Sequence, residues 1–107
     1  MKNIPKISVL CGLIAMSGAA WAQGTAEAGR AKVELCIGCH GIPGGYKATY
    51  PEVYRVPKIG GQSAKYLEAA LKGYRSGERK HPTMRSIAGS LSDQDMADIA
   101  AYFAAQK

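Results

Sequence analysis

The clearest helical pattern in the chain lies at residues 63–74. Apolar and aromatic side chains recur there at helical spacing, at Tyr66, Leu67, Ala70, Leu71 and Tyr74. Polar side chains occupy the opposite face, and Ser63 and Gly77 are suited to cap the two ends. The stretch is therefore predicted to form an amphipathic helix whose whole apolar stripe, Tyr66 included, faces the core.

A second helix is predicted at residues 92–105. Its apolar face consists of Met96, Ile99, Ala100 and Phe103, so Met96 is interpreted as a core residue. Ser92 and Asp95 have the spacing of a capping box, in which each side chain bonds the other's backbone N–H. The C-terminal end of the chain is therefore expected to be a well-defined helix.

The remaining patterns are weaker. Residues 25–35 are predicted to form a helix with Ala28, Ala31 and Leu35 on its buried face, and Gly29 there indicates the close approach of another helix. Residues 79–90 are predicted to be a basic loop and a short helix. Glycines and prolines between residues 41 and 62 predict turns, and the contacts of the loop at residues 46–55 are unassigned. No strand pattern is found, so the fold class is all-α.

Residues 1–22 are predicted to be a cleaved secretory signal peptide. Lys2 and Lys6 flank the start of an apolar run, which ends at the small-residue cleavage site Ala20-Trp21-Ala22. The run is too short to span a membrane comfortably, and an uncleaved anchor is the alternative. Cys11 lies within the run, where cleavage for lipid attachment would leave too little apolar sequence. The mature chain is expected to begin at Gln23, in the periplasm.

Removing this leader changes the composition. The mature chain has 85 residues, 107 less 22, and its twelve basic and eight acidic residues give a net charge of +4. One Phe and no Trp remain, so the side chains of this single small domain supply a modest core. A large apolar cofactor would complete that core, and without it the chain is expected to be largely unfolded. The basic charge gives weak support for an acidic partner and none for nucleic acid.

One short motif carries the chemistry: Cys36-Ile37-Gly38-Cys39-His40. Two cysteines three positions apart, followed at once by a histidine, have the spacing that attaches a c-type haem. Each thiol can form a thioether to one vinyl group of the porphyrin, and the adjacent histidine can then bind the iron. The motif predicts one covalently bound haem c per chain, held by Cys36 and Cys39, with His40 as an axial iron ligand.

Three other interpretations of the two cysteines are weaker. A thioredoxin-like pair follows a strand in an alternating strand–helix pattern, which this sequence lacks. A structural zinc site needs four ligands, usually two Cys pairs or a Cys pair and a His pair. The mature chain has one Cys pair, Cys36 and Cys39, and its two histidines, His40 and His81, do not form such a pair. A disulfide between the two cysteines would close a very short loop.

Met84 is the candidate for the sixth iron ligand. It follows a proline outside any long apolar stripe, and a thioether ligand favours ferrous iron and suits electron transfer. His81 is the main rival, and an open sixth position is a further possibility. The carbonyl of Pro57, a residue without an N–H of its own, is predicted to accept a hydrogen bond from Nδ1 of His40 and so to orient the imidazole.

The mature chain resembles a class I cytochrome c, and is similar to cytochrome c4-type domains and monohaem cytochrome c-553 proteins. The resemblance covers nearly all of residues 25–105 and depends on the motifs at residues 36–41, 57–62, 74–79 and 84–96. It implies a small cytochrome c fold at residues 23–107, with about four short helices around one covalent haem. It also implies that Gly29 and Tyr102 lie where the first and last helices cross, that Met84 is the distal ligand and that Pro57 is the partner of His40. Cytochrome c4 proper has two haems, whereas this chain has one motif.

The resemblance and the motif together predict a periplasmic monohaem electron carrier whose iron cycles between Fe(II) and Fe(III). It is expected not to be an enzyme, to bind no small-molecule substrate and to have no membrane span after signal cleavage. Its partners are expected to be redox proteins in the periplasm or at the inner membrane surface. The alternatives are a haem subunit of a larger oxidoreductase, such as a flavocytochrome for sulfur compounds, and a ligand-sensing haem.

Overall fold

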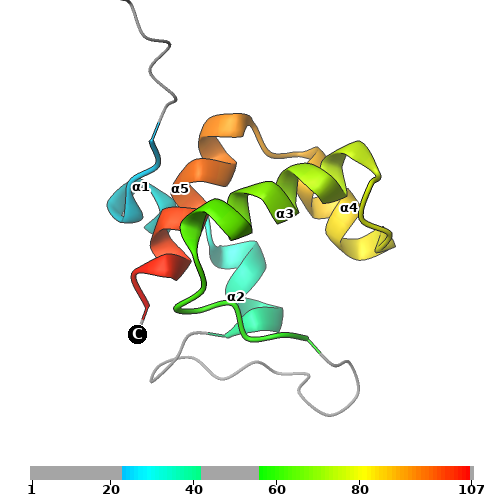
Figure 1. Cartoon of the computed structure of the whole chain (residues 1–107). Coiled ribbons are helices and arrows are strands. Elements are labelled where there is room, and N and C mark those ends of the chain that lie inside the picture. The colour runs from blue at the N-terminus through cyan, green and yellow to red at the C-terminus, as the bar shows by residue number, and fades with distance from the viewer. Residues whose placement is uncertain (1–22, 42–55, 107) are drawn as a thin grey trace, which may run out of the picture.

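The computed structural model describes residues 23–41 and 56–106, and these form five helices and no strand (Figure 1). The helices are α1 (Ala26–Arg30), α2 (Glu34–His40), α3 (Ala64–Ser76), α4 (Pro82–Gly89) and α5 (Asp93–Ala104). The all-α prediction is confirmed. The leader predicted at residues 1–22 and the loop at residues 46–55 lie outside the described residues. None of the five helices is long and apolar enough to cross a membrane.

The helix predicted at residues 25–35 is broken in two, which is why five helices are present where about four were predicted. α1 ends at Arg30, and a tight turn, in which the Lys32 N–H donates to the Gly29 carbonyl at 2.8 Å, leads to α2. The predicted buried face is also wrong, because Leu35 is 68% exposed and Ala28 and Ala31 are exposed as well. The break rotates the chain so that Gly29 and Val33 are the buried residues.

Gly29 lies where α1 crosses α5. A Cβ atom placed on Gly29 would lie 2.1 Å from the Asp98 carbonyl oxygen and 2.8 Å from the Tyr102 Cβ. Both distances are shorter than any side chain tolerates, so the crossing requires a glycine. The expectation that Gly29 and Tyr102 meet at this crossing is confirmed, and α1 and α5 pack against each other there.

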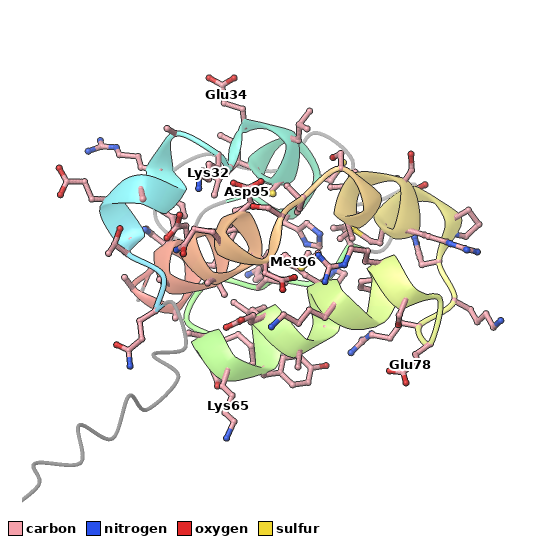
Figure 2. All side chains as sticks on the ribbon, turned by 90° about the horizontal axis from the view of Figure 1, so that it is seen from above. Lys32, Glu34, Lys65, Glu78, Asp95 and Met96 are labelled. Carbon is pink, nitrogen blue, oxygen red and sulfur yellow. The ribbon has the colours of Figure 1, made fainter. Side chains whose placement is uncertain are left out.

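The core is built around α5. Val33, Leu67, Ile99, Ala100 and Phe103 form its central cluster. Met96 is fully buried, as the spacing predicted, and lies inside the ring of helices in Figure 2. The capping box is present, with the Asp95 N–H donating to Ser92 Oγ and the Ser92 N–H donating to Asp95 Oδ2, both at 3.0 Å. α5 is therefore fixed both by its buried face and by its start.

α3 packs against α5 and α4 and is capped as predicted. Ser63 accepts from the Tyr66 N–H, and Gly77 ends the helix at a φ of 87°, a left-handed conformation that suits glycine. Leu67 is buried, but Tyr66 is 50% exposed, so the predicted stripe is too wide. Tyr66 turns outward toward Arg79, whose guanidinium carbon lies 5.8 Å from the centre of its ring.

An ionic cluster that the sequence did not predict joins the start of the chain to α5. Asp98 is only 3% exposed. It accepts hydrogen bonds from the Thr25 N–H at 2.9 Å, from Gln94 Nε2 at 3.1 Å and from Lys32 Nζ at 2.6 Å. Lys32 also pairs with Asp95 at 2.9 Å, as the labelled side chains in Figure 2 show. The cluster holds the turn that precedes α2 against α5.

Candidate functional site

The haem-attachment motif occupies α2. Cysteines three positions apart lie on one side of a helix. Cys36 is half-buried, Cys39 is exposed, and neither forms a disulfide. α2 contains no fully buried residue, unlike every other helix of the described part of the chain. The motif therefore lies on a helix that rests on the core without being enclosed by it.

The ends of α2 are fixed by its neighbours. Val33, a residue of the central core cluster, accepts through its carbonyl from the N–H groups of Cys36 and Ile37, both at 2.9 Å. At the other end the Gly41 N–H donates to the Ile37 carbonyl at 2.8 Å. Gly41 has a φ of 68°, which a residue with a side chain adopts only with strain. This glycine therefore ends α2 directly after His40.

Nδ1 of His40 lies 2.7 Å from the Pro57 carbonyl oxygen, so the predicted pair of groups is in contact. With Nδ1–H donating, Nε2 is the ring nitrogen left to bind a metal. The segment that carries Pro57 is anchored to α5, because the Gly61 N–H donates to the Phe103 carbonyl at 2.8 Å. The side chain of Ile59 also packs against the core cluster. The orientation of the imidazole thus depends on contacts that begin in the core.

Met84 lies on a separate element, α4, and is half-buried. Its backbone N–H donates to His81 Nδ1 at 3.2 Å, so the side chain of His81 caps the start of α4. His81 is exposed, and its ring packs edge-on to Tyr74 with centroids 6.3 Å apart. The two candidates for the sixth ligand therefore differ. Because Nδ1 of His81 accepts this hydrogen bond, the ring N–H is on Nε2, and the ring has no free nitrogen to bind iron while the cap is intact. The thioether of Met84 has no role in the cap.

The thiol of Cys36 is unsuited to thioredoxin-like chemistry. Burial raises the pKa of the Cys36 thiol to about 11, and the neighbouring Cys39 adds to the effect. A reactive dithiol depends on a lowered pKa that keeps one sulfur ionised near neutral pH. The environment of α2 acts in the opposite direction and favours the haem interpretation over the redox-active dithiol.

The residues of α2 and of the core border fit a haem. Besides Cys36, whose side chain packs against the core cluster, the partly buried apolar side chains on that cluster are Ile37, Ile59, Ala64, Leu71, Leu91 and Tyr102. Such a half-covered apolar border suits a large flat hydrophobic group. The described core has only two large side chains that are fully buried, Phe103 and Met96, so the protein gains much from one more apolar body.

Two features near the site were missed by the sequence analysis. One is the ionic cluster of Lys32, Asp95 and Asp98. The only sequence feature that indicates it is the pair of aspartates three positions apart in α5, Asp95 and Asp98. The other is the stack of Arg79 on Tyr74 and Tyr66, at 4.9 and 5.8 Å from the ring centres. No periodicity predicts that stack, because Arg79 lies beyond the end of α3 and folds back.

Comparison with known proteins identifies relatives over most of the chain. A family model described as Cytochrome c matches residues 26–107. Cytochrome c-554(548) of Halomonas halodenitrificans is 44% identical over 88 residues, which cover 78% of this chain and 99% of that protein. Cytochrome c4 of Pseudomonas aeruginosa is 42% identical over 94 residues, which cover 88% of this chain and 44% of that protein.

The structure agrees with these matches. It is similar to the crystal structure of reduced recombinant cytochrome c4 from Pseudomonas stutzeri, with a TM-score of 0.66 and 40% identity, over 78% of this chain and 46% of that chain. The chain thus spans about half the length of the cytochrome c4 proteins. A relative named cytochrome subunit of sulfide dehydrogenase, from Chlorobaculum tepidum, is 32% identical over 64% of this chain and 56% of that protein. The family match, the fold and the motif agree, and the chain belongs to the cytochrome c family.

Proposed function

We propose that this chain is a monohaem c-type cytochrome that carries one electron at a time between redox proteins. The observation that carries the proposal is α2, where two cysteines that form no disulfide precede an imidazole whose Nδ1 is 2.7 Å from the Pro57 carbonyl. Covalently attached haem c is the cofactor of this family, and it supplies a one-electron iron couple. The chain breaks no substrate bond, so its residues bind, orient and shield the cofactor.

Each residue of the motif has a distinct role in this proposal. Cys36 and Cys39 hold the porphyrin through two thioethers, and His40 binds the iron through Nε2. The Pro57 carbonyl fixes the plane of the imidazole and increases its basicity, which stabilises the oxidised iron. The apolar border around the core excludes water from the cofactor, and this tunes the reduction potential.

Met84 is proposed as the sixth ligand. Two observations support it over the other candidates: the α4 cap occupies Nδ1, the acceptor nitrogen of His81, and Met96 is fully buried in the core. A thioether raises the reduction potential relative to a second imidazole. A complete set of two protein ligands also suits a carrier, because no position is left open for a small molecule.

The cellular setting follows from the predicted leader. Residues 1–22 direct export and are removed, and residues 23–107 form the cytochrome domain in the periplasm. The electron donor and acceptor are redox proteins of that compartment or of the inner membrane surface. Docking is expected to be weak and small, as is usual for transient redox encounters.

The experiment that tests the ligand assignment compares Met84→Ala with Met96→Ala. The oxidised unmutated protein is expected to be low-spin, with the weak long-wavelength absorption band of sulfur-to-iron charge transfer. Met84→Ala should lose this band. Met96→Ala should keep it and instead lose about 2–5 kcal/mol of stability, as expected for truncation of a buried methionine.

Three results would contradict this assignment. A band that persists in Met84→Ala would exclude Met84 as the ligand. A low-spin spectrum without the band in the unmutated protein would assign the sixth position to His81 or Lys80. A high-spin spectrum would leave the position open and favour a ligand-sensing haem over a carrier.

The second candidate function is a haem subunit of a larger oxidoreductase. It is favoured by the relative named as the cytochrome subunit of sulfide dehydrogenase. The two functions differ in their assembly, because a subunit is expected to co-purify with a larger flavin- or copper-containing chain. A free carrier is expected to elute alone from a size-exclusion column loaded with periplasmic extract.

A further inference from the structure

A basic hollow lies where the end of α3 meets α4. It is shallow and open to solvent, with a volume of about 580 Å³. Its lining consists of Gly77, Arg79, Lys80, His81, Pro82, Arg85, Ser86 and Gly89. Three of these eight residues are cationic and none is acidic. We call this feature the α3–α4 hollow.

The three cations of the hollow have no acidic partner within residues 23–41 and 56–106. The ion pairs found there join Lys32 to Asp95 and Asp98, Lys72 to Glu68, and Arg75 to Asp93. Glu78, the one acidic residue next to the hollow in the sequence, is exposed and lies outside the lining. The hollow therefore presents excess positive charge, and that charge is concentrated on a concave surface.

The guanidinium of Arg79 is held in place before any partner arrives, and Arg85 lies beside the end of α3. Arg79 stacks on Tyr74 and Tyr66, and its Nη1 donates to Tyr66 Oη at 3.4 Å. The guanidinium carbon of Arg85 would lie only 3.8 Å from a Cβ on Gly77, so this side chain lies against the end of α3. A fixed planar guanidinium loses less entropy on binding a carboxylate than a free lysine does.

We propose that the α3–α4 hollow docks an acidic segment of the redox partner, whose carboxylates pair with Arg79, Arg85 and Lys80. An arginine can bind a carboxylate through two parallel hydrogen bonds, so the fixed guanidinium of Arg79, with Arg85 and Lys80 nearby, favours one orientation of the bound segment. The identity of the partner as a redox protein depends on the proposed function. The preference for an acidic segment depends only on the charge and shape of the hollow.

The surface argues for a protein segment over other polyanions. Single-stranded nucleic acid needs aromatic rings on which successive bases stack, and the lining of the hollow contains no Tyr, Phe or Trp. Arg79 already stacks on the two tyrosines of the neighbouring helix, Tyr66 and Tyr74. A lipid surface needs apolar side chains that insert, and the large exposed apolar residues of the described chain are Leu35 and Tyr66, neither of which lines the hollow. Electrostatic docking also speeds encounter, which suits a carrier.

The test is a titration of the reduced, haem-loaded protein with a hexaglutamate peptide at low ionic strength, followed by backbone amide shifts. The shifts are expected to cluster at residues 79–89. Lys80→Gln and Arg85→Gln should each weaken binding by about twofold to fivefold, and Glu78→Gln should strengthen it by a similar factor. The matched control is Lys65→Gln, which also removes one positive charge. Lys65 and Glu78 lie at opposite ends of α3 (Figure 2), so this variant should leave the affinity for the peptide unchanged.

Several outcomes would overturn the proposal. Shifts spread over the whole basic surface, or an equal loss of affinity in Lys65→Gln and Arg85→Gln, would show general charge attraction without a docking site. Inorganic phosphate that binds the hollow as tightly as the peptide would identify a small-anion site. Tighter binding to vesicles of anionic lipid would identify a membrane surface. Because the readout is binding, it stays separate from the absorption spectrum that tests the proposed function.

Discussion

α5 and α2 differ in how completely the protein encloses them. α5 has twelve residues, of which Met96, Ala97, Asp98, Ile99, Ala100 and Phe103 are buried, and it begins with a capping box. α2 has seven residues and buries none, and no side chain caps its start at Val33. The two helices are linked through the core, because Val33 packs in the same cluster as Ile99 and Phe103.

The difference shows which part of the fold the polypeptide completes by itself. α5 meets its neighbours through close apolar contact and through the ionic cluster at Asp98. α2 offers thiols, an imidazole and a half-covered apolar border, which are the groups that a covalent haem needs. We infer that the polypeptide's own side chains pack the α1–α5 crossing closely, whereas the packing of α2 is completed by the cofactor, on which the stability of the whole chain depends.

The largest expected effect comes from Cys36→Ala combined with Cys39→Ala. The double variant cannot form either thioether, so it should carry no haem after denaturing electrophoresis. The far-ultraviolet circular dichroism should fall to that of a largely unfolded chain, because the side chains alone supply a modest core. A variant that keeps the helical signal of the unmutated protein would contradict the view that the cofactor completes the fold.

Two glycine substitutions compare the halves directly. In Gly29→Ala the new Cβ meets the Asp98 carbonyl oxygen at 2.1 Å, and the helices must separate, at a cost of about 1–3 kcal/mol. A Cβ atom on Gly38 of α2 would meet nothing within 4 Å. Because alanine has a higher helix propensity than glycine, Gly38→Ala should increase the stability by less than about 1 kcal/mol. Denaturant unfolding of both haem-loaded variants measures the difference in stability. Equal losses of stability in the two variants would contradict the view that α5 is enclosed more completely than α2.

An effect no larger than that of Gly29→Ala is expected in the ionic cluster that closes the α1–α5 side. Asp98→Asn keeps the shape of the side chain but leaves Lys32 without its buried counter-charge, at a cost of about 1–3 kcal/mol at neutral pH. The ion pair with Lys32 and the Thr25 N–H hold the pKa of Asp98 below its usual range. For Asp95, hydrogen bonding to the Ser92 backbone and then to Lys32 lowers the pKa to about 2.

These shifts fix the sign of the acid response. Both carboxylates contribute stability above the ordinary aspartate value of about 3.9, and that contribution is lost as the pH falls through their lowered pKa values. The unmutated protein should therefore lose stability between about pH 4 and pH 2. Asp98→Asn should lose less over the same interval, as measured by denaturant unfolding at each pH. An equal loss of stability in both proteins over this interval would show that protonation of Asp98 is not coupled to unfolding.

The sequence predicted those parts of the fold that depend on local signals. The caps at Ser63, Gly77 and Ser92 and the burial of Met96 and Phe103 follow from spacing and turn chemistry, and the structure confirms them. The crossing at Gly29 was expected from the family resemblance and from the poor helix propensity of glycine. The His40–Pro57 contact was predicted from the chemistry of a metal-bound imidazole, and the hydrogen-bonding distance agrees with it.

The parts that were missed depend on contacts between distant residues. The break between α1 and α2 is not visible in the helical spacing of residues 25–35. Lys32, in the turn between the two helices, forms ion pairs with Asp95 and Asp98, which are more than sixty positions away in the sequence. Tyr66 was assigned to the core because it continues an apolar stripe, whereas Arg79 offers its ring a contact at the surface. At both Lys32 and Tyr66, contacts with residues distant in the sequence outweigh the preference indicated by the local helical spacing.

The intact mass of the chain purified from the periplasm, followed by peptide mapping, tests the central claim most directly. The predicted result is a chain that begins at Gln23 and carries the mass of one haem, with the added mass on the peptide that contains Cys36 and Cys39. An unmodified chain whose two thiols both react with an alkylating reagent would contradict the claim that a covalent haem completes the α2 side of the fold.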